Sequence, residues 1–128
     1  MLDTSEDSNH ILLADDNAVN AEVTAALLER VGYTVDIAHN GQRAVEMAGQ
    51  KAYCAMILDC RMPVLDGYAT ATIIRSQGDH HRTIPIIALS GYEPRTHAAK
   101  IEAAGMNDCL TKPVLMADLK AVLDKWLS

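Results

Sequence analysis

A chain of 128 residues suits one globular domain with a buried core, and a hydrophobic content of 49% excludes a disordered chain. The formal net charge of −6 argues against binding of nucleic acid or an anionic membrane by this domain, because both surfaces are themselves negative. Part of the acidic excess is available to hold a cation instead.

The start of the chain is polar and acidic. We therefore expect a tail or linker over residues 1–9, followed by a single domain over residues 10–128. The three cysteines are an odd number without C-x-x-C spacing, which favours reduced thiols. No apolar run has the length of a membrane span, and together these features predict a cytoplasmic location.

Short apolar runs alternate with longer amphipathic stretches, a pattern typical of βα units around a parallel sheet. Several runs are apolar at consecutive positions, as strands covered on both faces must be. The segments that we predict as strands are residues 11–14, 34–37, 55–58, 84–89 and 108–110.

Between these runs the apolar residues recur with a helical period. The predicted helices cover residues 19–30, 44–48, 68–75, 94–104 and 115–126. Gly32 and Gly105 follow two of the helix ends, and Asp66 is a candidate N-cap. His80 and His81 are interpreted as part of a polar loop without metal-ligand spacing. Five βα units result, which is an α/β fold with helices on both faces of the sheet.

Polar side chains follow four of the predicted strands. Asp15 and Asp16 come after the first strand, Asp59 after the third, Ser90 after the fourth and Lys112 after the fifth. The carboxyl ends of parallel strands lie along one edge of the sheet, where ligands bind. The sequence therefore predicts one pocket that contains three carboxylates, a hydroxyl and an ammonium group.

Three neighbouring carboxylates repel one another and require a counter-charge. Mg²⁺ or Mn²⁺ would supply it, because such cations take oxygen ligands and bridge to phosphate oxygens. Asp59 would then act as a nucleophile that forms an aspartyl-phosphate. The cation and Lys112 would neutralise the phosphoryl oxygens, and Ser90 would donate a hydrogen bond to one of them.

Four motifs occur in order at the predicted strand ends: Leu13-Ala14-Asp15-Asp16-Asn17, Asp59-Cys60-Arg61-Met62-Pro63 with Asp66-Gly67, Ala88-Leu89-Ser90-Gly91 and Lys112-Pro113. In these motifs the chain resembles the receiver domains of two-component signalling, over residues 10–127. The resemblance implies a flavodoxin-like (βα)5 three-layer sandwich with a five-stranded parallel sheet of order 2-1-3-4-5.

The resemblance also implies roles for individual residues. Mg²⁺ would be held by Asp16, Asp59 and the backbone carbonyl of Arg61, with Asp15 acting through water. The Lys112–Pro113 peptide bond would be cis.

Two further motifs are similar to those of receivers fused to hybrid histidine kinases. They are Asp15-Asp16-Asn17-x-x-Asn20 and the run Gly105-Met106-Asn107-Asp108. This similarity implies a phosphoryl group received from a kinase histidine and relayed to a histidine phosphotransfer protein. The domain would be a monomer or weak dimer, and its parent could be a membrane-bound sensor kinase. A stand-alone single-domain response regulator is the alternative.

One position departs from the family pattern. Cys109 stands where receivers usually carry an aromatic residue that moves with the switch hydroxyl, here Ser90, and the chain contains no phenylalanine. Tyr92 is the nearest aromatic residue that could report on phosphorylation instead. We hypothesise that signalling relies on residues 90–94 and on the fourth helix.

Three other functions remain open on the sequence. An aspartate-nucleophile phosphatase of the haloacid dehalogenase type needs a second acid two residues after the nucleophile, where this chain has Arg61. A flavodoxin-like cofactor module needs a phosphate-binding loop where Asp15 and Asp16 stand. A receiver that is no longer phosphorylated would be expected to lose residues that are all present. We therefore expect a domain that catalyses its own phosphorylation and dephosphorylation, rather than an independent turnover enzyme.

Overall fold

A five-stranded parallel sheet forms the centre of the molecule. The computed structural model describes residues 9–91 and 97–127. The strands are β1 (His10–Ala14), β2 (Thr34–Ala38), β3 (Ala55–Asp59), β4 (Ile86–Ser90) and β5 (Asp108–Thr111). They pair in the order β2-β1-β3-β4-β5, which confirms the order that the family resemblance implies.

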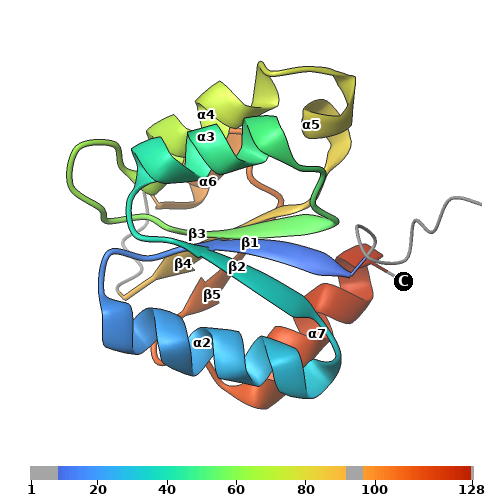
Figure 1. Cartoon of the computed structure of the whole chain (residues 1–128). Coiled ribbons are helices and arrows are strands. Elements are labelled where there is room, and N and C mark those ends of the chain that lie inside the picture. The colour runs from blue at the N-terminus through green and yellow to red at the C-terminus, as the bar shows by residue number, and fades with distance from the viewer. Residues whose placement is uncertain (1–8, 92–96, 128) are drawn as a thin grey trace, which may run out of the picture.

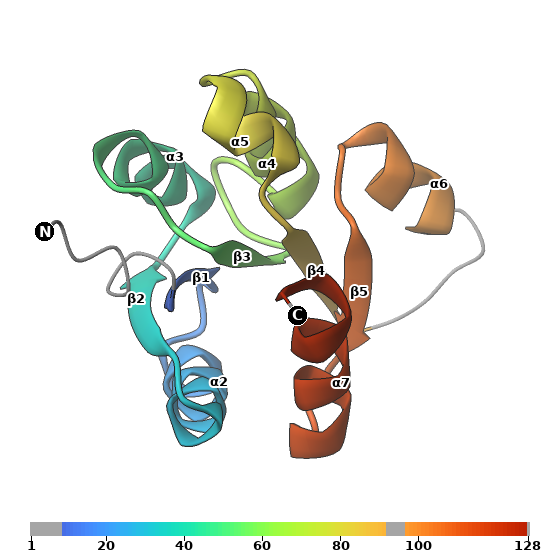
Figure 2. The same cartoon turned by 90° about the vertical axis from the view of Figure 1, so that its right-hand side faces the viewer.

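Helices cover both faces of this sheet. One face carries α2 (Ala18–Val31) and α7 (Met116–Leu127). The other face carries α3 (Gly41–Gln50), α4 (Gly67–Arg75), α5 (Asp79–Thr83) and α6 (His97–Ala103). Figures 1 and 2 show the resulting three layers, as expected for an α/β sandwich. None of the described helices is long and apolar enough to cross a membrane.

The central strands carry the core. All residues of β3 and β4 are buried, so their side chains fill both spaces between sheet and helices. Met56 and Leu58 belong to the cluster beneath α3 and α4, whereas Ile57 belongs to the cluster beneath α2 and α7. Each fully buried aliphatic side chain contributes roughly 1.5–3 kcal/mol. Consecutive apolar residues are therefore the strongest fold signal in the sequence.

Capping residues mark several helix ends, and Gly32 and Asp66 are two that the sequence predicts. Gly32 ends α2 with a left-handed φ of 111°. The side chain of Asn40 accepts a hydrogen bond from the backbone of Arg43, and Asp66 accepts one from Ala69. The two side-chain caps satisfy N–H groups that have no partner within the helix.

The region before β4 differs from the sequence prediction. His80 and His81 lie in the short helix α5 rather than in a loop, and β4 begins at Ile86 rather than at residue 84. Pro85 has no N–H to donate to a sheet, although its carbonyl accepts from the backbone of Met56. The predicted start of the fourth helix, residue 94, lies outside the described residues.

Candidate functional site

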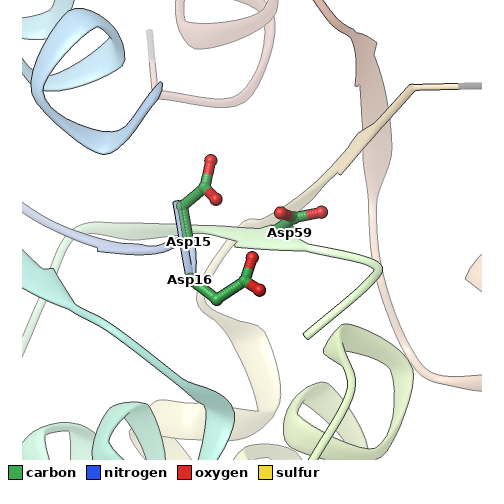
Figure 3. Close-up of side chains that lie close together, drawn as sticks. All are labelled: Asp15, Asp16 and Asp59. Atoms are coloured by element: carbon green, nitrogen blue, oxygen red, sulfur yellow. The ribbon is translucent and has the colours of Figure 1, made fainter. Parts of the chain in front are cut away.

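Three carboxylates meet at the carboxyl ends of β1 and β3. Asp15 and Asp16 directly follow β1, and Asp59 is the last residue of β3 (Figure 3). One oxygen from each carboxylate lies within 4.8 Å of the others. Asp15 and Asp59 are buried, at 0% and 2% exposure, whereas Asp16 is exposed. The strand pairing explains this meeting, because Ala14 on β1 is aligned with Leu58 on β3.

Backbone N–H groups hold one oxygen of each buried carboxylate. Asp15 Oδ1 accepts from the backbone of Asn17 at 3.0 Å, and Asp59 Oδ1 accepts from the backbone of Arg61 at 3.1 Å. Each bond spans two residues and is an Asx-turn contact. The two loops therefore orient the carboxylates and leave their second oxygens facing the site.

Lys112 supplies a positive charge to the same site. Its Nζ donates to Asp59 Oδ2 at 2.8 Å and lies 3.9 Å from Asp15 Oδ2. Its backbone N–H donates to the carbonyl of Ser90 at 2.7 Å, which ties the ends of β4 and β5 together. The Lys112–Pro113 peptide bond is cis, as the resemblance implies.

The electrostatic balance at the site favours an added cation. Within the described part of the chain, three carboxylates face the Lys112 ammonium group, so two negative charges remain if all four groups are ionised. Asp15 Oδ2 is fully buried and has no hydrogen-bond partner among the described residues. A buried acceptor without a partner is costly unless another group satisfies it. The donor set fits a hard divalent cation, which takes oxygen ligands and neutralises charge.

The ionisation of Asp15 responds to this environment. Burial raises the pKa of its carboxyl from 3.8 to about 6; the Asp59 carboxylate adds to the rise, and the Asn17 N–H and Lys112 oppose it. Because the folded-state pKa lies above the unfolded one, the folded protein holds this proton more tightly. This tighter proton binding stabilises the folded state. The stabilisation is fully present below about pH 4 and is lost as the pH rises through 6.

Asp15 should therefore give the metal-free protein a measurable pH dependence. In EDTA, the wild-type free energy of unfolding should fall by about 2–3 kcal/mol between pH 4 and 7 relative to the Asp15→Asn variant. Urea unfolding at intervals across this range measures the difference. Parallel curves for the two proteins would show that Asp15 does not titrate as described. Adding Mg²⁺ should weaken the wild-type decline, because the cation favours the ionised carboxylate.

Gly67 fixes the backbone that carries Asp59. A Cβ at Gly67 would overlap the carbonyl oxygen of Asp59 and would lie 2.9 Å from the Cα of Cys60. The backbone N–H of Gly67 also donates to the carbonyl of Cys60 at 3.1 Å. The start of α4 therefore lies directly against the end of β3.

The Gly67→Ala substitution should lower stability by about 1–3 kcal/mol, because the backbone at Asp59 must move to admit the methyl group. Gly49→Ala is a matched control in α3, where the nearest atom to the new Cβ would be Gln77 Nε2 at 3.9 Å. The control should be neutral or stabilising, since alanine favours helix. Denaturant midpoints measure both, and equal effects would contradict the close-packing account.

The structure brings most of the predicted site residues together. Asp15, Asp16, Asp59 and Lys112 form one group, and Ser90 is buried at the end of β4. The backbone N–H of Arg61 contacts Asp59, so this residue also lies at the site. A metal-binding role for its carbonyl stays a prediction.

The structure describes one of the two other predicted switch residues. Tyr92 falls outside the described residues. Cys109 is half-buried in β5, aligned with Ala88 of β4, and packs against the core beneath α3 and α4.

Sequence reasoning did not assign roles to two contributors to the site. Asn17 supplies the N–H that orients Asp15, and Gly67 provides the close contact with Asp59. Both residues lie within the quoted motifs. Their roles depend on backbone geometry, which the sequence does not show directly. The only sequence signals were Asp15, two residues before Asn17, and Asp66, directly before Gly67.

Comparison with known proteins places this arrangement among signalling domains. The family model described as the response regulator receiver domain matches residues 11–124. The hybrid signal transduction protein dokA of Dictyostelium discoideum is 36% identical over 123 residues, which cover 96% of this chain and 7% of dokA. Two-component system protein A of Emericella nidulans is 43% identical over 120 residues, which cover 91% of this chain and 17% of that protein. The chain thus spans only a small part of these relatives.

Two solved receiver-domain structures are similar to this chain. The receiver domain of sensor histidine kinase PA1611 from Pseudomonas aeruginosa, with magnesium coordinated in its active-site cleft, is 41% identical with a TM-score of 0.86. The alignment covers 93% of this chain and 97% of that one. The Saccharomyces cerevisiae receiver domain of Ssk1, in complex with the histidine phosphotransfer protein Ypd1, is 27% identical with a TM-score of 0.81. That alignment covers 91% of this chain and 87% of the matched chain.

Proposed function

The chain belongs to the response regulator receiver domain family of two-component phosphorelays, and we propose that it accepts a phosphoryl group on Asp59. The observation that carries this proposal is the contact of the buried Asp59 carboxylate with Lys112 at 2.8 Å, within 4.8 Å of the Asp15 and Asp16 carboxylates. This arrangement pairs a fixed nucleophile with positive charge and with ligands for a cation.

Mg²⁺ would be held by Asp16, Asp59 and the backbone carbonyl of Arg61, with Asp15 acting through water; Mn²⁺ suits the same oxygen ligands. When bound, the cation supplies positive charge to the phosphoryl oxygens. Two observations support this assignment: the buried Asp15 Oδ2 lacks a hydrogen-bond partner among the residues that the structure describes, and the similar PA1611 receiver holds magnesium in its active-site cleft.

Asp59 would attack the phosphorus atom with one carboxylate oxygen. A new O–P bond forms while the bond from phosphorus to the donor breaks, and the donor leaves with that electron pair. Lys112 would stabilise the charge on the phosphoryl oxygens, and Ser90 would donate its hydroxyl proton in a hydrogen bond to one of them. A phosphatase of the haloacid dehalogenase type needs a second acid two residues after the nucleophile, where this chain has Arg61. We therefore propose that the domain catalyses its own phosphorylation and does not turn over external phosphate esters.

A protein carrying phosphohistidine is the proposed donor, either a histidine kinase or a histidine phosphotransfer protein. The buried Asp59 can be reached only if the donor contacts the surrounding edge of the sheet. Exposed aliphatic side chains near that edge support protein docking, namely Val19, Val23 and Leu115. A cleft of about 280 Å³ between Val23 and Pro113 reaches Asp15 and Lys112.

The proposed parent is a hybrid histidine kinase, which the similarity to dokA and to the PA1611 receiver supports. A stand-alone regulator is the alternative. The free thiols of the three cysteines are consistent with the proposed cytoplasmic location. Switching is proposed to involve Ser90, Tyr92 and Cys109, together with α6.

Phosphorylation by a small donor tests the proposed function. Incubation with acetyl phosphate and Mg²⁺ should add one acid-labile phosphoryl group per chain, and EDTA should prevent the addition. Intact-mass measurement before and after acid treatment provides the readout. A chain that stays unmodified under these conditions, or is modified equally in EDTA, would contradict the proposal.

A further inference from the structure

The guanidinium of Arg75 joins several segments at the amino ends of β4 and β5, whereas the acidic site lies at the carboxyl ends of the strands. It donates to the carbonyl of Gly105 through Nε at 2.8 Å and Nη2 at 2.6 Å. Nη1 donates to the carbonyls of His81 and Ile84 at 2.9 and 2.6 Å, and Nη2 donates to Asn107 Oδ1 at 2.8 Å. All five bonds go to uncharged oxygen atoms. The end of α4 is therefore fixed to the segments that lead into β4 and β5.

Asn107 extends this network to the first residue of β4. Its Oδ1 accepts from the backbone of Ile86 at 2.8 Å, and its own N–H donates to the carbonyl of Ile86 at 2.7 Å. Both backbone groups of Ile86 are thus bonded to the residue that precedes β5. These two bonds set the starting register, in which Ile87 is aligned with Asp108. A slip by one residue would turn the side chains of β5 to the opposite face.

The same strand pair ends at the acidic site. Ser90 is aligned with Thr111, and the next residue, Lys112, donates its N–H to the carbonyl of Ser90 at 2.7 Å. β5 lies at the edge of the sheet order and pairs with β4. The position of the Lys112 ammonium relative to Asp59 therefore depends on the β4–β5 register.

Helix α4 connects the two ends of the sheet. Its first residue, Gly67, lies against the backbone of Asp59, and its last residue is Arg75. Through Arg75 and Asn107, the helix that supports Asp59 also holds the start of the strand that leads to Lys112. The two charged partners are consequently located by one connected set of contacts.

We propose that Arg75 and Asn107 are positioning residues that fix the register of β5 and thereby place Lys112 against Asp59. Their effect on phosphoryl transfer rests on the proposed function of Asp59, whereas their effect on Lys112 does not. The proposed cation ligands lie at the end of β3 and in the loops that follow β1 and β3, so loss of the network should slow transfer without weakening Mg²⁺ binding.

Two substitutions of Asn107 with side chains of similar size test whether the acceptor oxygen is required. Asn107→Leu removes the oxygen that Arg75 and Ile86 share, whereas Asn107→Asp keeps an acceptor in the same place. Arg75→Met removes the donor. Gln77→Ala is the matched control, because Gln77 bonds to the carbonyl of Val45 on α3 rather than to β5.

Amide hydrogen exchange in the full chain provides a readout that does not depend on phosphorylation. Asn107→Leu and Arg75→Met should speed exchange of the Lys112 amide at least tenfold, with the amides of β1 and β3 changing less than threefold. Asn107→Asp and Gln77→Ala should stay within threefold of wild type at Lys112. Equal acceleration across the whole sheet would indicate simple destabilisation and would overturn the proposal, as would an unchanged Lys112 amide in both disruptive variants.

Phosphorylation by acetyl phosphate at saturating Mg²⁺ adds a second readout. Asn107→Leu should slow labelling at least tenfold with the Mg²⁺ dissociation constant within twofold of wild type, and Asn107→Asp should restore the rate. A variant whose Lys112 amide exchanges faster but which is phosphorylated at the wild-type rate would overturn the positioning role. If wild type itself is not labelled, the proposed function fails, and the exchange measurement still decides the placement of Lys112.

Discussion

Asp59→Asn is expected to abolish phosphorylation of this chain by acetyl phosphate in Mg²⁺. An amide oxygen is a far weaker nucleophile than a carboxylate oxygen, so the attacking group is lost. The fold should be kept, because the Asn side-chain oxygen can still accept from the N–H of Arg61. Intact-mass measurement should show no added phosphoryl group, against one group per wild-type chain.

Asp66→Asn is the matched control for this change. Asp66 lies in the same loop and caps α4 through Ala69, a role that asparagine also fills. The control should be phosphorylated at the wild-type rate. Labelling of Asp59→Asn at more than one-tenth of that rate would mean that another residue is the acceptor.

Lys112→Met is expected to have the second large effect. The substitution leaves the buried carboxylates of Asp15 and Asp59 without their ammonium partner. Removing one member of a buried ion pair costs about 3–5 kcal/mol. In EDTA at pH 7 the free energy of unfolding should therefore fall by about 3 kcal/mol, since protonation of Asp15 offsets part of the cost. Mg²⁺ should recover much of this loss, because the cation replaces the missing charge.

Phosphoryl transfer should also slow in the Lys112→Met variant at saturating Mg²⁺. Loss of one stabilising donor at a reacting oxyanion typically costs about 10²–10³-fold in rate. Lys120→Met, at an exposed position of α7, is the control and should leave both rate and stability near wild type. Urea unfolding with and without Mg²⁺ measures the stability effect, and a time course of labelling measures the rate. A variant as stable in EDTA as the control would contradict the electrostatic account of the site.

The sheet and the acidic group could be predicted from the sequence for a physical reason. Strands covered on both faces need consecutive apolar residues, as in Ile57-Leu58, and parallel strands bring their carboxyl ends to one edge. Asp15, Asp59 and Lys112 each follow such a strand, so their convergence follows from the topology. The strand order came from the family resemblance rather than from the pattern of residues.

Other features depend on contacts that leave no periodic signal. Helix α5 is a short segment, and its carbonyl at His81 accepts from the side chain of Arg75, six residues earlier at the end of α4. The link from Asn107 to Ile86 spans 21 positions in the chain. In the sequence, a polar residue directly before a short strand, as Asn107 is, is typical of a turn. Only the folded structure shows that Asn107 bonds to Arg75 on α4 and to Ile86 on β4.

Chemical identification of the phosphorylated residue tests the central claim most directly. The wild-type chain is labelled with acetyl phosphate and Mg²⁺, reduced with borohydride to convert an aspartyl-phosphate to homoserine, digested and sequenced by mass spectrometry. We expect homoserine at position 59, with Asp15 and Asp16 unchanged. Homoserine at position 15 or 16, or none at position 59 in a chain that carries a phosphoryl group, would contradict the account.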